Sequence, residues 1–208
     1  MDGVFYNAGQ SCCAVERIYV HQSLYEQFLK RAVEVMNKLK IGDPMINSTD
    51  MGPLSQQSRL KAIEKQLKDA LDKGAKIIRH SGPLPKGEQY LLPAILTNVN
   101  HGMDVMMEET FGPIVGIMAV KSDEEAINLM NDSPYGLTAS IWTKDIDFAE
   151  HFGNKIQTGT FFMNRCDYLD PGLAWTGVKN TGKGCSLSEI SYEHLTKPKS
   201  FHLRKSLL

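Results

Sequence analysis

The sequence lacks the features that mark secreted, membrane-spanning and strongly charged proteins. Its start, MDGVFYNAGQSCC, has neither the basic segment nor the apolar stretch of a secretory signal. No run approaches the ~18 apolar residues that cross a bilayer. Four cysteines in 208 residues are too few for a disulfide scaffold. A formal net charge of −1 gives no general attraction for nucleic acid or an anionic membrane. We therefore expect a cytoplasmic protein with no nucleic-acid or membrane partner.

The sequence also contains little that would hold a metal ion or a phosphate group. It has no GxGxxG and no P-loop, and its six histidines are scattered, with no two lying three or four residues apart. Cys166 and Cys185 are far apart and lack a second cysteine pair, so the spacing of a zinc site is absent. We predict no metal site.

The pattern of apolar residues predicts an α/β domain. Residues 17–21 are rich in β-branched and aromatic side chains, and residues 116–120 form the continuous apolar run of a buried parallel strand. Apolar residues at helical spacing predict helices over residues 23–39 and 55–73. Strands alternate with helices over most of the chain, which indicates a largely parallel sheet flanked by helices. Further strands are predicted over residues 76–80, 91–99, 137–143, 158–163 and 200–203.

Polar residues and glycine predict where helices begin and end. Ser23 with Glu26, and Ser122 with Glu125, have the spacing of a capping box, in which the serine hydroxyl accepts a bond from a first-turn amide. Asp145 is placed to cap a short helix that ends near residue 152, and Gly74 is placed to end the helix over residues 55–73.

The most informative segment for chemistry is residues 5–14, FYNAGQSCCA. Gly9 allows a tight turn just before two adjacent thiols, Cys12 and Cys13, and a strand follows. A thiolate in this position can attack a carbonyl carbon. Taken alone, the two cysteines are better explained as small buried apolar residues than as a nucleophile, because no base is visible nearby in the sequence.

A second segment of interest is residues 107–113, MEETFGP. Its carboxylates precede a buried strand, where a carboxylate can hold a ribose diol through its two acceptor oxygens, and its aromatic ring can pack against a cofactor. The alternative is a charged turn followed by a core phenylalanine. The glycine-rich residues 175–184, WTGVKNTGKG, are compatible with a loop beside a ligand or with a plain surface loop.

Together these segments resemble the NAD(P)-dependent aldehyde dehydrogenase superfamily. Residues 5–12 are similar to its nucleophile motif, and residues 108–113 are similar to its cofactor-contact motif, E-E-x-F-G-P. Residues 134–137, 142–145 and 159–164 also follow in the family's order. The resemblance covers nearly the whole chain and includes three ordered motifs, two of them specific.

The resemblance implies a role for each matching residue. Cys12, rather than Cys13, would attack an aldehyde to form a thiohemiacetal. Hydride transfer to NAD or NADP would leave a thioester, which water hydrolyses to a carboxylic acid. The Cys12 backbone N–H would donate to the oxyanion. Glu109 would accept hydrogen bonds from the nicotinamide ribose, Phe111 would pack beside the nicotinamide ring, and Cys13 would serve in packing.

The chain departs from the family at residues 173–182, LAWTGVKNTG, where P-F-G-G-x-K-x-S-G is usual. Residues 164–168, near the expected substrate entrance, resemble a less studied branch. These differences leave the aldehyde open. Arg165 could pair with an acidic aldehyde or form a structural ion pair.

Family members are usually more than twice this long, so the resemblance implies a missing preceding part. That part would contain the dinucleotide-binding domain, the general-base glutamate and the asparagine that completes the oxyanion hole. We predict an aldehyde dehydrogenase catalytic domain over residues 3–190 and a C-terminal tail over residues 191–208 with a possible oligomerisation strand. Residues 200–204 alternate as such a strand would. The expected partners are an aldehyde and either further copies of the chain or an N-terminal half, and the isolated chain should not sustain turnover.

Two other hypotheses come from different functional classes. The chain could be a non-catalytic remnant that acts as an assembly or interaction module, which predicts stable oligomers and no nucleotide affinity. It could also be a cofactor-free thiol hydrolase that uses Cys12, because thioester chemistry allows weak ester cleavage.

Overall fold

The apolar run around residues 116–120 forms the middle of a four-stranded sheet in the computed structural model. Strand β4 (Ile114–Val120) pairs in parallel with β1 (Arg17–His21) on one side and with β3 (Ala94–Thr97) on the other. Strand β2 (Lys76–Arg79) pairs antiparallel with β3 and completes the order β1-β4-β3-β2. The prediction of a largely parallel sheet is confirmed. The structure describes residues 1–166 and 168–206.

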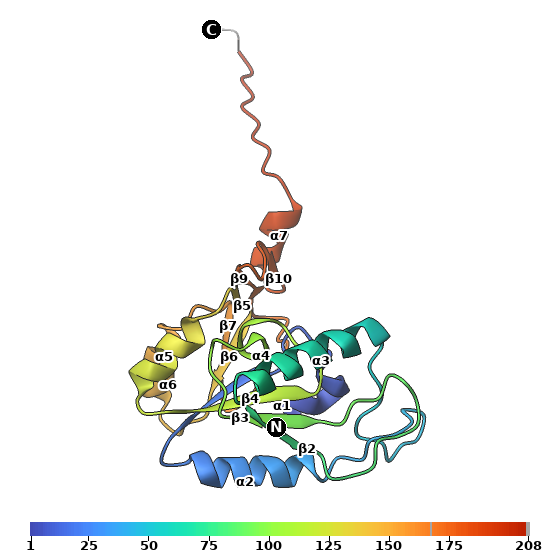
Figure 1. Ribbon diagram of the computed structural model, residues 1–208. Helices are drawn as coiled ribbons and strands as arrows, with labels where there is room; N and C mark the ends of the chain where they lie inside the picture. The colour runs from blue at the N-terminus through green and yellow to red at the C-terminus, as the bar shows by residue number, and fades with distance from the viewer. Residues whose placement is uncertain (167, 207–208) are drawn as a thin grey trace.

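Helices cover both faces of this sheet (Figure 1). Val115 and Ile117 of β4 are buried in one apolar cluster with residues of α1 and α2. Ile114 is buried in a second cluster with residues of α3 and α4. Because successive side chains of a strand point to opposite faces, a central strand covered on both sides must be apolar throughout. The helices of this part are α1 (Asp2–Phe5), η1 (Tyr6–Gly9, a 3-10 helix), α2 (Tyr25–Met36), α3 (Gln57–Asp72) and α4 (Asp104–Met107).

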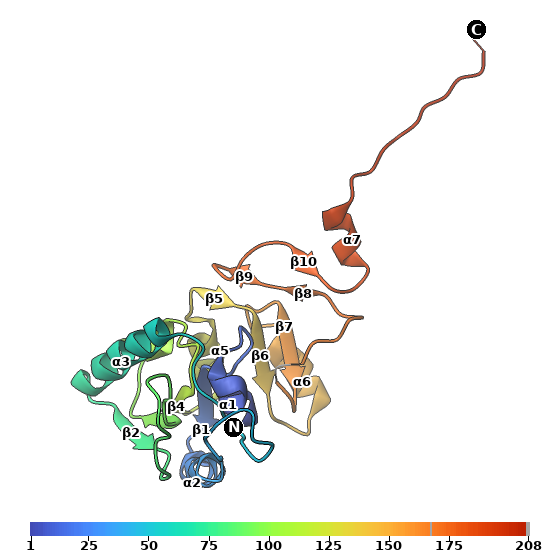
Figure 2. The same cartoon turned by 90° about the vertical axis from the view of Figure 1, so that its right-hand side faces the viewer.

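The C-terminal part of the chain forms smaller units beside and beyond the sheet. β6 and β7 pair in parallel, β5 pairs with β9, and β8 pairs with β10. Figure 2 shows that β8 to β10 lie at one end of the body and that α7 and the tail extend away from it. The elements are α5 (Asp123–Asn131), β5 (Tyr135–Gly136), β6 (Thr138–Ile141), α6 (Ile146–Gly153), β7 (Thr160–Met163), β8 (Trp175–Thr176), β9 (Val178–Lys179), β10 (Cys185–Ser186) and α7 (Ile190–Leu195).

Three of the four predicted helix ends are confirmed. Ser122 and Asp145 accept hydrogen bonds from the backbone amides three residues later, at 3.2 Å and 2.9 Å. Gly74 has a φ of +95° and follows the last residues of α3, where the Gly74 and Ala75 amides donate to the carbonyls of Leu71 and Ala70, both at 2.9 Å. These paired bonds form a Schellman motif.

The capping box predicted at Ser23 is wrong. The Ser23 hydroxyl lies 2.8 Å from Nδ1 of His21, and α2 begins at Tyr25 after Leu24, which makes no side-chain cap. Residues 22–24 form a turn in which the Leu24 amide donates to the His21 carbonyl at 2.9 Å, so α2 begins one residue later than the capping box requires. A local pattern was overridden here by a neighbour two residues upstream.

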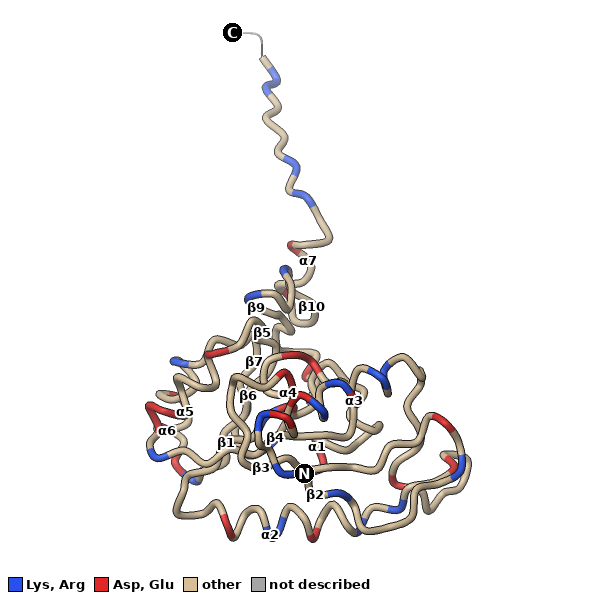
Figure 3. Tube along the Cα trace, in the orientation of Figure 1, with Lys and Arg blue, Asp and Glu red and all other residues tan. Residues whose placement is uncertain are grey.

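The C-terminal tail is basic and partly apolar. All charged residues within residues 196–206 are basic, and Figure 3 shows them spaced along the tail. Phe201 and Leu203 are exposed, and residues 196–206 pair with no other described strand. A strand used in subunit assembly pairs with a partner chain, so the oligomerisation strand stays a prediction. The domain boundary near residue 190 also stays a prediction. No helix in the described part of the chain is long and apolar enough to cross a membrane.

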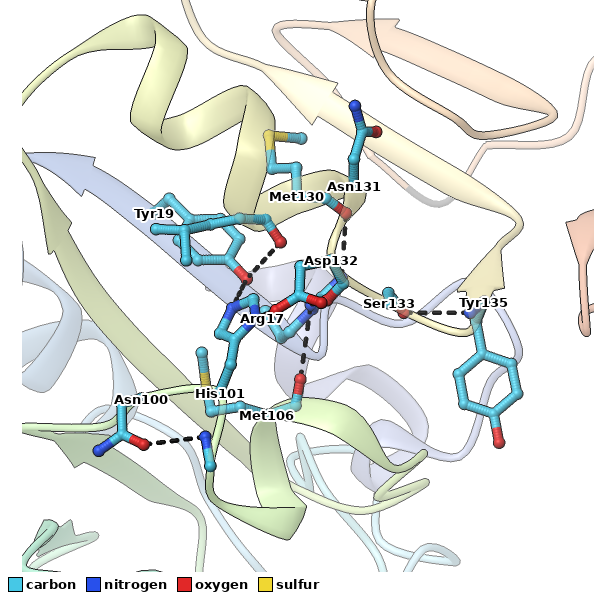
Figure 4. Close-up of polar contacts among 12 residues, drawn as sticks. Arg17, Tyr19, Asn100, His101, Met106, Met130, Asn131, Asp132, Ser133 and Tyr135 are labelled. Atoms are coloured by element: carbon cyan, nitrogen blue, oxygen red, sulfur yellow. Dashed lines mark hydrogen bonds and ion pairs between the residues drawn. The ribbon is translucent and has the colours of Figure 1, made fainter.

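A polar network fastens the edge strand β1 to the end of α5 (Figure 4). The Arg17 guanidinium donates to the backbone carbonyl of Asp132 at 3.1 Å. The Tyr19 hydroxyl lies 2.8 Å from Nε2 of His101, whose Nδ1 lies 2.6 Å from the Asp132 carboxylate. Three segments far apart in sequence are held together by this chain of contacts.

This network predicts a loss of stability in alkali. Burial raises the pKa of Tyr19 to about 12, so the phenol ionises near pH 10 in the unfolded chain and only near pH 12 in the folded one. Protonated Tyr19 therefore contributes its full share to the free energy of unfolding below pH 10. This share, about 2 kcal/mol, is lost as the pH rises toward 12. In Tyr19→Phe, urea unfolding between pH 9 and 11.5 should show a shallower decline. Equal slopes in the two proteins would contradict this account.

Candidate functional site

The first loop of the candidate site is built on an unusual turn. Asn7, Ala8 and Gly9 all have left-handed backbone angles, with φ of 49°, 55° and 71°. The Asn7 side chain donates to the Gln10 carbonyl at 2.9 Å, and the Gln10 side chain donates to the Asn7 carbonyl at 3.0 Å. Asparagine and glycine tolerate this region, and the reciprocal bonds offset the strain at Ala8. The turn is thus specified by residues of the loop itself, and it leads directly to Cys12.

The two adjacent cysteines differ in their environment. Cys12 is exposed, whereas Cys13 is 8% exposed and its Sγ lies 3.3 Å from the Ser11 hydroxyl. Partial burial and the neighbouring Cys13 raise the pKa of the Cys12 thiol, and the negative charge of Glu109 raises it further. Cys12 is therefore an accessible thiol that stays protonated at neutral pH.

The structure brings the two predicted loops into direct contact. A Cβ atom placed on Gly9 would overlap the backbone carbonyl oxygen of Gly112. Only glycine permits the backbone of the first loop to approach the second so closely. The Gln10 side chain also accepts a bond from the Ser55 amide at 2.8 Å, which ties the first loop to the segment before α3. Residues about a hundred positions apart thus form one surface.

The second loop presents a carboxylate and an aromatic ring. Glu109 is exposed, and its charge acts on the Cys12 thiol, so these two side chains share one electrostatic environment. Phe111 is half-buried and has a φ of 50°, a backbone conformation that is costly for residues other than glycine. The Arg59 guanidinium of α3 lies 5.4 Å from the centre of its ring. This is the distance of a cation–π contact.

Residues 175–184 contain the short strands β8 and β9, and β10 follows directly after them. Strands β8 and β10 pair with each other, and β9 pairs with β5. Nearby, a cavity of about 110 Å³ is lined by residues that include Arg165, Tyr168 and Trp175. The Arg165 guanidinium stacks 3.6 Å from the centre of the Tyr168 ring and makes no ion pair with any described carboxylate. In the described residues, no cluster of three or more His, Cys, Asp or Glu could hold a metal ion.

Sequence reasoning missed the residues that support the second loop. Glu16 accepts hydrogen bonds from the backbone amides of Thr110 and Phe111, and Gln66 of α3 donates to the carbonyl of Glu109 at 3.5 Å. A charged residue just before a strand is normally solvated, and a glutamine within a polar helix is unremarkable. Neither position therefore carries a local signal of its role.

Comparison with known proteins gives consistent matches. The sequence model of the aldehyde dehydrogenase family matches residues 1–201. The 3-sulfolactaldehyde dehydrogenase of Priestia aryabhattai is 38% identical over 194 residues, which are 93% of this chain and 40% of that protein. The mitochondrial aldehyde dehydrogenase of Mesocricetus auratus is 31% identical over 201 residues, or 97% of this chain and 40% of that protein.

Solved structures give the same result for the fold. The betaine aldehyde dehydrogenase of Staphylococcus aureus in complex with NAD+ superposes with a TM-score of 0.87 at 31% identity, covering 93% of this chain and 39% of that one. The lactaldehyde dehydrogenase of Escherichia coli gives a TM-score of 0.85 at 32% identity, covering 91% and 40%. The chain spans about two fifths of the length of these relatives.

Proposed function

Because the chain belongs to the aldehyde dehydrogenase family, we propose that it is the thiol-bearing part of an enzyme that oxidises an aldehyde to a carboxylic acid, with Cys12 as the nucleophile. The observation that carries the proposal is the contact between the Cys12 loop and the loop of Glu109 and Phe111. It gathers an accessible thiol, a free carboxylate and an aromatic ring. In this proposal residues 3–190 form the catalytic domain and residues 191–208 the assembly tail.

The chemistry assigned to Cys12 follows from its exposure. As a thiolate, its sulfur forms a bond to the aldehyde carbon, and the carbonyl electrons move to oxygen, where the Cys12 backbone N–H can donate. A nicotinamide cofactor, when bound, supplies the acceptor for the hydride that must leave this carbon for a thioester to form. Water then cleaves the thioester, which releases the carboxylic acid and restores the thiol.

The residues present fit such a cofactor. Glu109 is exposed and carries two acceptor oxygens that suit a ribose diol, and the half-buried Phe111 provides an aromatic ring that can pack beside a flat heterocycle. Glu109 lies on the loop whose Gly112 closely approaches Gly9 of the Cys12 loop, so a group held by Glu109 would lie on the same surface as the thiol. The proposed cofactor is NAD or NADP. NAD+ is present in the solved betaine aldehyde dehydrogenase.

We propose further that this chain works as part of a larger assembly. The raised pKa of Cys12 means that a base or a cation must be supplied before the thiol reacts fast at neutral pH. The relatives carry more than half of their length outside the matched region. The proposed partner is either an N-terminal half or further copies of the chain. The proposed compartment is the cytosol, a reducing one, in which the four cysteines stay reduced.

Two assays on the purified chain test this proposal. Absorbance at 340 nm with NAD or NADP and a panel of aliphatic, aromatic and semialdehyde substrates should show no turnover by the isolated chain. At least one aldehyde should nevertheless slow the alkylation of Cys12 by iodoacetamide, because addition to the carbonyl needs no cofactor. An aldehyde panel that leaves alkylation of Cys12 unchanged would contradict the assigned nucleophile. Turnover that depends on Cys12 would confirm the chemistry and show that the chain is sufficient.

A second candidate function is an assembly module without catalysis. The tail exposes large apolar residues, which include Tyr192, Leu195 and Phe201 at 68%, 82% and 72% exposure. Such side chains are covered in an oligomer. This candidate predicts stable oligomers in which no aldehyde protects Cys12, and protection or turnover would eliminate it.

A further inference from the structure

Glu16 joins the two loops of the candidate site. It lies four residues after Cys12 and directly before β1. Its two carboxylate oxygens accept hydrogen bonds from the backbone amides of Thr110 and Phe111, each at 3.0 Å. One carboxylate thus holds two successive amides of a loop that is more than ninety residues away in the sequence.

The same loop is held from its other side by α3. The carbonyl of Glu109 accepts the bond from Gln66, and the amide of Thr110 donates to Glu16, so one peptide unit is fixed at both its oxygen and its nitrogen. This peptide unit joins Glu109 to Thr110, so it begins at the Cα atom that carries the Glu109 side chain. The next residue, Phe111, has the left-handed φ of 50°. Such a conformation persists where the surroundings over-determine it.

Partial burial makes a merely incidental role for Glu16 costly. A half-buried carboxylate loses part of its hydration, and hydrogen bonds from the protein replace what is lost. Glu16 makes no ion pair with any described cation. Burial raises the pKa of Glu16, and the two loop amides act in the opposite direction. The two loop amides therefore compensate for the partial loss of hydration of this carboxylate.

We propose that Glu16 is a positioning residue, which sets the position of Glu109 and Phe111 relative to Cys12 by holding the Thr110 and Phe111 amides. The inference deepens the proposed function and rests on it for the meaning of these positions. The clamp itself rests only on the hydrogen bonds. Glu16 touches neither the thiol nor any reacting group, so it acts through the loop.

The first test uses Glu16→Gln, which keeps the length of the side chain but replaces one acceptor oxygen by an NH2 group. Amide hydrogen exchange at Thr110 and Phe111 should become at least about tenfold faster, because a bond to a charged acceptor is lost. Exchange in β4 should stay unchanged. Glu64→Gln, the same chemical change on the exposed face of α3, is the matched control and should alter neither amide.

A second readout separates positioning from simple stability. Since the charge of Glu109 raises the pKa of Cys12, Glu109→Gln should lower that pKa, as measured by the pH dependence of Cys12 alkylation. In the Glu16→Gln background the same change should have a smaller effect, because the loop no longer holds position 109 in place. A full-sized effect of Glu109→Gln in that background would overturn the proposal, as would unchanged amide exchange.

A measurement on the unaltered chain covers the case in which Glu16→Gln does not fold. The Glu16 carboxyl carbon and the Thr110 and Phe111 amide protons should titrate together in NMR spectra, above the ordinary pKa of glutamate. The charge of Glu109 also raises the pKa of Glu16, and Glu109→Gln should leave the joint titration in place. Amide protons that do not follow the carboxyl group would overturn the clamp. If the clamp holds while no aldehyde protects Cys12, the proposed function fails and the clamp stands.

Discussion

Replacing Cys12 with alanine is expected to remove the reaction of the folded chain with aldehydes and to remove its most accessible site of alkylation by iodoacetamide. Cys12 is exposed, Cys13 is buried, and Cys166 and Cys185 are half-buried. Mass spectrometry of the alkylated peptides measures each thiol separately. Because the pKa of Cys12 is raised, alkylation of the unaltered chain should keep accelerating above about pH 8.5, the ordinary pKa of a thiol.

The control for this prediction is Cys185→Ala, which makes the same chemical change at a half-buried thiol in β10. It should leave both the alkylation of Cys12 and its protection by aldehydes as they are. Fast single-site alkylation that survives in Cys12→Ala would assign the reactive thiol to another cysteine, and the nucleophile would have to be sought there.

Among substitutions that add one methyl group to the candidate site, Gly9→Ala should reduce stability the most. The φ of +71° is unfavourable for alanine, and the new Cβ would overlap the carbonyl oxygen of Gly112. Because that oxygen belongs to a backbone packed beneath α3, neither loop can yield cheaply. We expect a loss of about 3 kcal/mol in the free energy of unfolding, measured with urea, from backbone strain and overpacking together.

Gly184→Ala separates the two causes. Gly184 has a φ of +92°, and nothing lies within 4 Å of an added Cβ, so only the strain of about 1 kcal/mol should appear. Equal losses in the free energy of unfolding of the two variants would mean that overlap with the second loop adds nothing to the cost of Gly9→Ala. In Gly9→Ala the loops should also separate, and the influence of Glu109 on the pKa of Cys12 should weaken.

Local patterns in the sequence predicted much of this fold, because their causes lie within a few residues. The continuous apolar run of β4 follows from burial on both faces, and the caps at Ser122 and Asp145 join a side chain to an amide three residues on. Gly74 ends α3 by its own positive φ. The two motifs that include Cys12, Glu109 and Phe111 were also visible, although their roles remain proposals.

What the sequence by itself determined is therefore the α/β class, the order of the elements and the two loops that carry candidate chemistry. Only the tertiary structure decided how these loops meet. The approach of Gly9 to Gly112 and the bonds of Glu16 to the Thr110 and Phe111 amides depend on β1 and β4 lying side by side. Ser23 shows the same limit at short range, since its hydroxyl contacts the His21 ring and α2 begins without a side-chain cap. A hydrogen bond between distant residues leaves no periodic trace in a sequence, because its geometry is set by the packing of the elements that carry them.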